Sequence, residues 1–161
     1  MALYFASNTN ATTPAQQNLS SSSKTMIAIT AVTATLRRAF IYEFEVGASG
    51  TPNATDCAIV WDISAITSTG TGTVGVVTAL DQADAATGSA STINNTAEGI
   101  TTANSQRWQL AANQRASYRW VVNPGGPGEL VVPATNVAGL ALRAKSATFA
   151  STADAAIYFR E

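Results

Sequence analysis

The segment Leu36-Arg-Arg-Ala-Phe-Ile-Tyr-Glu-Phe-Glu-Val46 decides the fold class, because large apolar side chains alternate along it with polar ones. A repeat of two residues is typical of a β-strand with one buried face. Turn residues end the segment at Gly47-Ala-Ser-Gly50. We therefore predict a strand whose inward face holds Leu36, Phe40, Tyr42, Phe44 and Val46 and whose outward face holds Arg37, Ile41, Glu43 and Glu45.

Similar alternation before and after this segment predicts further short strands, and no stretch predicts a long helix. Asp62 and Ser64 are expected on an outer face. The residues expected to face the core in these other strands are Ile27, Ile29, Ile59, Trp61, Ile63, Val74, Val76, Leu80, Trp120, Leu140, Leu142, Ala155, Ile157 and Phe159.

Together these strands predict an all-β fold, a sandwich of two antiparallel sheets that is most often a jelly roll at this strand count. The alternative is an immunoglobulin-like sandwich, although the paired cysteines around a core tryptophan are missing. Residues 24–161 are predicted to form this single domain. The polar residues 1–23 are predicted to form an extended N-terminal arm or, alternatively, a frayed terminus. Residues 81–105 are small and polar and predict a long central loop.

The composition argues against most enzymatic chemistry. The 161 residues carry a net charge of −1, only 12% are charged, and there is no histidine and one cysteine. No basic field is present to attract nucleic acid. The sequence lacks the histidine and cysteine side chains that zinc sites and serine–histidine catalysis require. We therefore expect no metal, no cofactor and no enzymatic activity. Without a secretory signal pattern or a long apolar stretch, no membrane partner is expected.

Three local patterns have simple structural interpretations. Gly70-Thr-Gly-Thr-Val-Gly75 matches a dinucleotide-binding pattern, which requires a helix to follow. A β-branched run follows instead, so we predict a glycine–threonine hairpin. The carboxylate pairs Glu43/Glu45 and Asp81/Asp84 are expected on solvated surfaces.

A surface with few charges favours a subunit that neighbouring molecules cover, because mixed charges normally keep small proteins apart. Trp108 lies beside Arg107 outside any clear apolar stripe, which suggests an interface. We therefore predict contacts through the arm 1–23 and the loop 81–112. The candidate interface residues are Arg107, Trp108, Asn94, Asn95, Tyr4 and Phe5.

Residues 115–161 resemble the closing strands of small virion proteins of tailed bacteriophages. The resemblance lies in Arg119-Trp-Val-Val-Asn-Pro-Gly-Gly-Pro-Gly-Glu-Leu-Val-Val-Pro-Ala134, in Gly139-Leu-Ala-Leu-Arg-Ala-Lys-Ser146 and in Ala153-Asp-Ala-Ala-Ile-Tyr-Phe-Arg-Glu161. This pattern is similar to the jelly-roll decoration, or cement, proteins of icosahedral heads. The resemblance implies a non-enzymatic homotrimer, made in the host cytoplasm and seated on the capsid surface, where it bridges neighbouring major capsid subunits.

Two other functions remain open. A carbohydrate-binding module on a phage fibre or a secreted protein would use exposed aromatic side chains in a groove. A lyase on a β-sandwich would need acids, lysine or tyrosine clustered in a cleft, and the sequence supplies these residue types without a spacing that singles any of them out.

Overall fold

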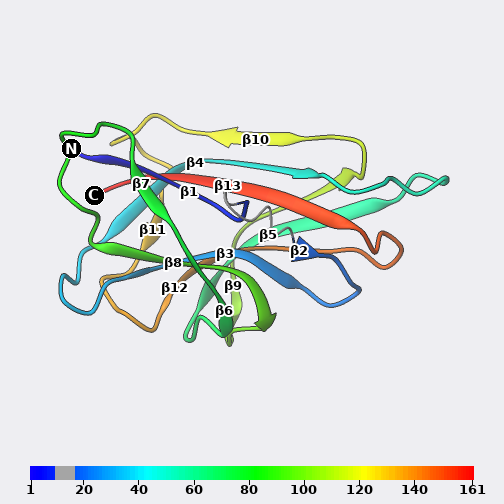
Figure 1. Cartoon of the computed structure of the whole chain (residues 1–161), viewed down its shortest axis with the longest axis horizontal. Coiled ribbons are helices and arrows are strands. Elements are labelled where there is room, and N and C mark those ends of the chain that lie inside the picture. The colour runs from blue at the N-terminus through cyan, green and yellow to red at the C-terminus, as the bar shows by residue number, and fades with distance from the viewer. Residues whose placement is uncertain (10–16) are drawn as a thin grey trace.

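The computed structural model describes residues 1–9 and 17–161. Two antiparallel sheets pack face to face as a sandwich, so the predicted all-β class and two-sheet architecture are confirmed (Figure 1). The described strands are β1 (Leu3–Ser7), β2 (Gln17–Asn18), β3 (Lys24–Ala31), β4 (Ala39–Ala48), β5 (Ala58–Ile66), β6 (Thr71–Gly75), β7 (Val77–Ala79), β8 (Ser89–Ala97), β9 (Thr101–Asn113), β10 (Tyr118–Val121), β11 (Leu130–Val132), β12 (Gly139–Lys145) and β13 (Thr152–Arg160).

The strand order ties the two layers together. The first sheet has the order β10-β4-β13-β1-β7, with β11 also pairing with β4 and β2 with β13. The second sheet has the order β6-β8-β3-β12-β5-β9. The main pairs are nested along the chain: β1 pairs with β13, β3 with β12, β4 with β10, and β5 with β9. From each of these pairs to the next, the two paired strands lie closer together in sequence. The connections between strands cross repeatedly from one sheet to the other.

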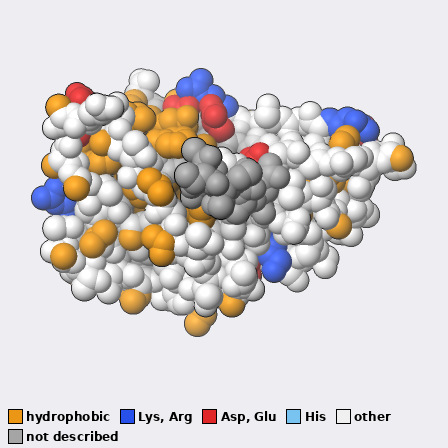
Figure 2. Space-filling view, in the orientation of Figure 1, with side chains coloured by type: hydrophobic (Ala, Val, Ile, Leu, Met, Phe, Trp, Pro, Cys, Tyr) orange, Lys and Arg blue, Asp and Glu red, His pale blue; other side chains and the backbone are white. Residues whose placement is uncertain are grey.

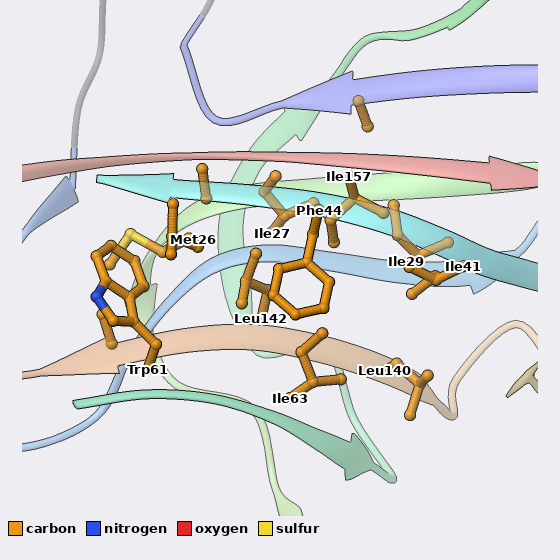
Figure 3. Packing of buried hydrophobic residues seen from close by; sticks show 14 of the residues in the cluster. Met26, Ile27, Ile29, Ile41, Phe44, Trp61, Ile63, Leu140, Leu142 and Ile157 are labelled. Carbon is orange, nitrogen blue, oxygen red and sulfur yellow. The ribbon is translucent and has the colours of Figure 1, made fainter. Parts of the chain in front are cut away.

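A continuous apolar core fills the space between the sheets. Figure 3 shows Phe44 of β4 pointing toward the second sheet, where Leu142 and Ile63 lie. The predicted inward faces of β3, β5, β12 and β13 are confirmed. Their fully buried members are Ile27, Ile29, Ile59, Trp61, Ile63, Leu140, Leu142, Ile157 and Phe159.

A β-bulge reverses the predicted orientation of the first half of β4. Tyr158 of β13 pairs with Glu43 and Phe159 pairs with Ile41, so Tyr42 is an extra residue in the ladder. An extra residue shifts every side chain beyond it to the other face. Ile41 is consequently fully buried, and Phe40 lies on the outer face. The predictions that Phe40 faces the core and Ile41 the solvent were wrong for this reason.

The predicted central loop is mostly strand. β8 and β9 occupy much of residues 81–105, because the buried side chains of β8 include serine and asparagine rather than only apolar residues. Hydrophobic periodicity, on which the prediction relied, cannot detect such a strand.

The predicted N-terminal arm also belongs in part to the sandwich. β1 lies between β13 and β7 in the first sheet, and β2 pairs with β13. Residues 10–16 of the predicted arm lie outside the described residues. Backbone pairing with β13 therefore fixes β1 and β2 in the sheet, and no local sequence pattern could have predicted this distant pairing.

The Gly/Pro turn after β10 is fastened to the C-terminal strand. The Glu129 carboxylate accepts hydrogen bonds from the Gly125 amide at 2.8 Å and from Arg160 Nε and Nη2 at 2.7 and 2.6 Å. The Arg160 hydrogen bonds lower the pKa of Glu129, although its burial acts in the opposite direction. On its other side, the Arg160 guanidinium lies 4.1 Å from the centre of the Phe40 ring.

An ion pair is buried on the outer face of the second sheet. Asp62 and Ser64 alternate with core residues, as predicted, but both are almost fully buried instead of solvated. Arg143 Nε and Nη2 donate to Asp62 Oδ1 at 3.0 and 2.8 Å, and Nη2 also donates to Ser64 Oγ at 3.0 Å. Ser64 donates to the same carboxylate oxygen at 2.7 Å. The three side chains thus form one hydrogen-bonded cluster centred on Asp62 Oδ1.

Asp62→Ala should destabilise the protein by about 3–5 kcal/mol, because the substitution leaves the Arg143 charge buried without a partner. Urea unfolding followed by tryptophan fluorescence measures the loss. Asp56→Ala is the matched control, since Asp56 forms an exposed pair with Arg115. Equal stability losses in the two variants would contradict a special role for the buried pair.

Candidate interaction surfaces

Aromatic side chains close one side of the sandwich, between β9 of the second sheet and β10 of the first. Trp108 meets Phe44 edge-on at 4.7 Å and stacks on Tyr118 at 5.6 Å between ring centroids. Trp120 stacks on Phe44, with 5.0 Å between the ring centroids. Tyr118 is the outermost member and is 36% exposed. Packing of this kind contributes to stability beyond its buried area.

A hollow of about 570 Å³ lies on the outer face of the first sheet, beside this aromatic cluster. Small residues such as Gly47 and Ala156 let a ligand approach the sheet there. The full lining consists of Ser7, Thr9, Glu45, Val46, Gly47, Ser117, Tyr118, Arg119, Asp154, Ala155 and Ala156. The hollow therefore combines one aromatic ring with hydroxyl, carboxylate and guanidinium groups.

Arg119 pairs with two carboxylates beside the hollow, where negative charges outnumber positive ones. Arg119 Nε contacts Glu43 Oε1 and lies 3.5 Å from Glu45 Oε1. The hydrogen bond with Glu43 is the main cause that raises the pKa of Arg119. Burial, followed by the charges of Glu45 and Glu43, raises the pKa of Tyr158 on the same face. Arg119 therefore stays charged and Tyr158 neutral at ordinary pH.

The opposite side of the sandwich carries exposed apolar residues. β6 and β7 are separated only by Val76 and form one extended segment. This segment passes from the edge of the second sheet to the edge of the first (Figure 1). Val74, Val76 and Leu80 are 84%, 64% and 51% exposed. The prediction that these three residues face the core was therefore wrong.

Close packing around two glycines explains why Val74 points outward. A Cβ atom on Gly75 would lie 2.5 Å from Ser91 Oγ and 2.8 Å from Ile93 Cγ2. A Cβ atom on Gly72 would collide with the Asn95 side chain and the Ile93 carbonyl. Gly72 and Gly75 thus have no room for side chains, whereas Val77 and Ala79 of β7 face inward and pack against the core. The glycine pattern lies in strand β6 and opens no nucleotide-binding helix. The predicted glycine–threonine hairpin was wrong, because β6 pairs with β8 and not with a strand next to it in sequence.

The six candidate interface residues do not form one surface. Tyr4 is 2% exposed and stacks on Phe159, and Asn95 is 1% exposed and donates to the Thr69 carbonyl. These two side chains are therefore unavailable to a partner. The other four predicted residues reach the surface to different degrees: Arg107 is exposed, whereas Trp108, Asn94 and Phe5 are half-buried.

The half-buried candidates also make contacts within the chain. The Asn94 amide donates to the Asn8 carbonyl at 2.9 Å, and the Phe5 ring lies 5.1 Å from that of Tyr158. Sequence reasoning missed Tyr118 and Arg119 at the hollow, because both precede a core tryptophan in an ordinary strand pattern. The outward valines had a detectable signal, since they alternate with glycines.

Known proteins do not extend these observations. Comparison of the chain with protein-family models, with curated proteins and with solved structures gives no match. Across residues 1–9 and 17–161, no three His, Cys, Asp or Glu side chains are grouped so that they could hold a metal ion. The same residues include no helix of the length and apolarity needed to cross a membrane.

Trp108→Ala should lower the free energy of unfolding by about 2–3 kcal/mol, because it removes a ring that packs between Phe44 and Tyr118. Trp108→Phe, which keeps an aromatic ring, should retain most of the stability. Guanidinium chloride unfolding followed by circular dichroism tests both variants. Wild-type stability in Trp108→Ala would contradict a structural role for this ring.

Proposed function

We propose that the chain is a non-enzymatic structural subunit of a phage particle, which associates with copies of itself, as a homotrimer, and decorates the capsid by bridging neighbouring major capsid subunits. Its location would be the capsid surface of the virion, after synthesis in the host cytoplasm. The resemblance of residues 115–161 to decoration proteins suggests this class. The exposed surfaces described above support it independently.

We also propose that the sandwich is a jelly roll. In that fold a long hairpin is rolled up, so that the first strand pairs with the last and the middle strands pair with each other. The orders β1-β13-β4-β10 and β3-β12-β5-β9 support the assignment, since they follow this nesting. The segment from β6 to β8 is then an insertion, which places β7 beside β1 and β8 beside β3.

The observation that carries the functional proposal is the presence of exposed apolar residues at opposite edges of the sandwich. Val74, Val76 and Leu80 lie along β6 and β7, whereas Val121 and Val131 lie on β10 and β11 at the other end of the first sheet. A subunit that bridges other proteins needs two separate contact surfaces. Large exposed apolar residues at such positions typically mark protein contacts.

Val121→Lys/Val131→Lys should weaken capsid binding at least about tenfold, because two apolar contacts are replaced by solvated charges. The two valines are 54% and 47% exposed, so the fold should tolerate the change. Cosedimentation with phage heads that lack the chain measures binding against the wild-type protein. Saturable binding of the wild type is the expected result. No binding by the folded wild type would contradict the decoration function.

A second candidate function is glycan binding in the hollow of the first sheet. The combination of Tyr118 with Glu45, Arg119 and Asp154 favours it, since sugars bind through ring stacking and polar groups. A glycan array probed with the wild type and Tyr118→Ala tests it. The decoration proposal predicts no specific signal, whereas a signal that Tyr118→Ala abolishes would favour the glycan function.

A further inference from the structure

The segment from β6 to β7 presents edges of both sheets on one side of the molecule. β6 is the last strand of the second sheet and β7 the last strand of the first. Within the described chain, no strand pairs with the outer edge of either one. Unpaired strand edges are templates for the addition of another strand. Figure 1 shows β6 and β7 as one continuous diagonal trace in green.

This side lacks the usual protection against unwanted pairing. Proteins commonly protect sheet edges with charged side chains or proline. Neither occurs between Asp62 and Asp81 in the sequence. The opposite side is protected, since Arg107, Arg115 and Arg119 are all exposed on or between β9 and β10. Only the β6–β7 side therefore lacks charged residues and proline along its edge strands.

The side chains on this side also favour an apolar contact. Val74 and Val76 project outward, because their neighbours Gly75 and Val77 occupy the inward positions. Burial of these valines against a partner would remove apolar surface from water. Figure 2 shows hydrophobic side chains at the surface over the part of the molecule that β7 crosses in Figure 1.

We infer that the β6–β7 side is the surface through which this chain binds a second copy of itself. Every copy carries the two sheet edges at the same spacing, so copies arranged around a rotation axis bring the same uncharged sides together. A segment without charges also faces itself without like-charge repulsion, and it offers no charge to attract a charged partner. This inference rests on the proposed self-association and names its surface.

The test compares the full-length wild type with Val74→Lys/Val76→Lys by size-exclusion chromatography with light scattering. The wild type should have a mass that is a multiple of the 16.6 kDa monomer, and the variant should elute as the monomer. Val121→Lys/Val131→Lys is the matched control, because it adds the same charge to exposed valines elsewhere and should keep the wild-type mass. Circular dichroism verifies that each variant is folded.

If the lysine variant does not fold, Val74→Thr/Val76→Thr keeps the β-branched shape and should raise the dissociation constant at least about tenfold. An unchanged mass of the folded lysine variant would overturn the inference but leave self-association in place. If the folded lysine variant lost capsid binding but kept the wild-type mass, the inference would also be overturned, and the β6–β7 side would be assigned to the capsid. A monomeric wild type would overturn self-association itself, while capsid cosedimentation would still test decoration separately.

Discussion

The pairing of β1 with β13 is the constraint on which the other strand pairs depend, because it joins the two ends of the chain in the middle of the first sheet. Every other main pair is nested inside it. Tyr4 stacks on Phe159 across this pair, and the buried Asn8 side chain accepts from the Ala155 amide at 2.7 Å and donates to the Ala153 carbonyl at 3.1 Å. Such contacts between distant residues form only when the whole sandwich assembles, which makes folding cooperative.

The same closure positions the segment from β6 to β8, which forms the proposed contact side. The Glu161 carboxylate accepts from the Thr87 and Ser89 hydroxyls and from the Gly88 amide at 2.7–2.8 Å, and so anchors the chain before β8. β8 in turn supports β6, whose glycines lie against its inward side chains. The outward valines are thus the consequence of a polar, tightly packed interior in this part of the molecule. Two apolar surfaces at opposite edges, with few charges, suit a protein that acts by adhesion to its neighbours.

The sequence was sufficient to predict the strands whose buried faces are apolar, such as Ile59 to Ile63 in β5 and Ile157 to Phe159 in β13. It was insufficient wherever the determining contact is distant. The bulge at Tyr42 depends on β13, and the burial of Asp62 depends on Arg143 in a neighbouring strand. Likewise, Val74 and Val76 follow the expected alternation, but the pairing of Gly75 with β8 and of Val77 with β1 decides which face is outward.

The central claim is that this chain acts as a structural subunit on a capsid surface rather than as an enzyme. A cryo-electron microscopy reconstruction of the particle that carries it tests this claim most directly. The account predicts density for the sandwich on the outside of the head, with the β6–β7 sides of adjacent copies in contact and a separate surface on the major capsid subunits. Density for the chain elsewhere in the particle only, or its absence from purified particles, would contradict the account.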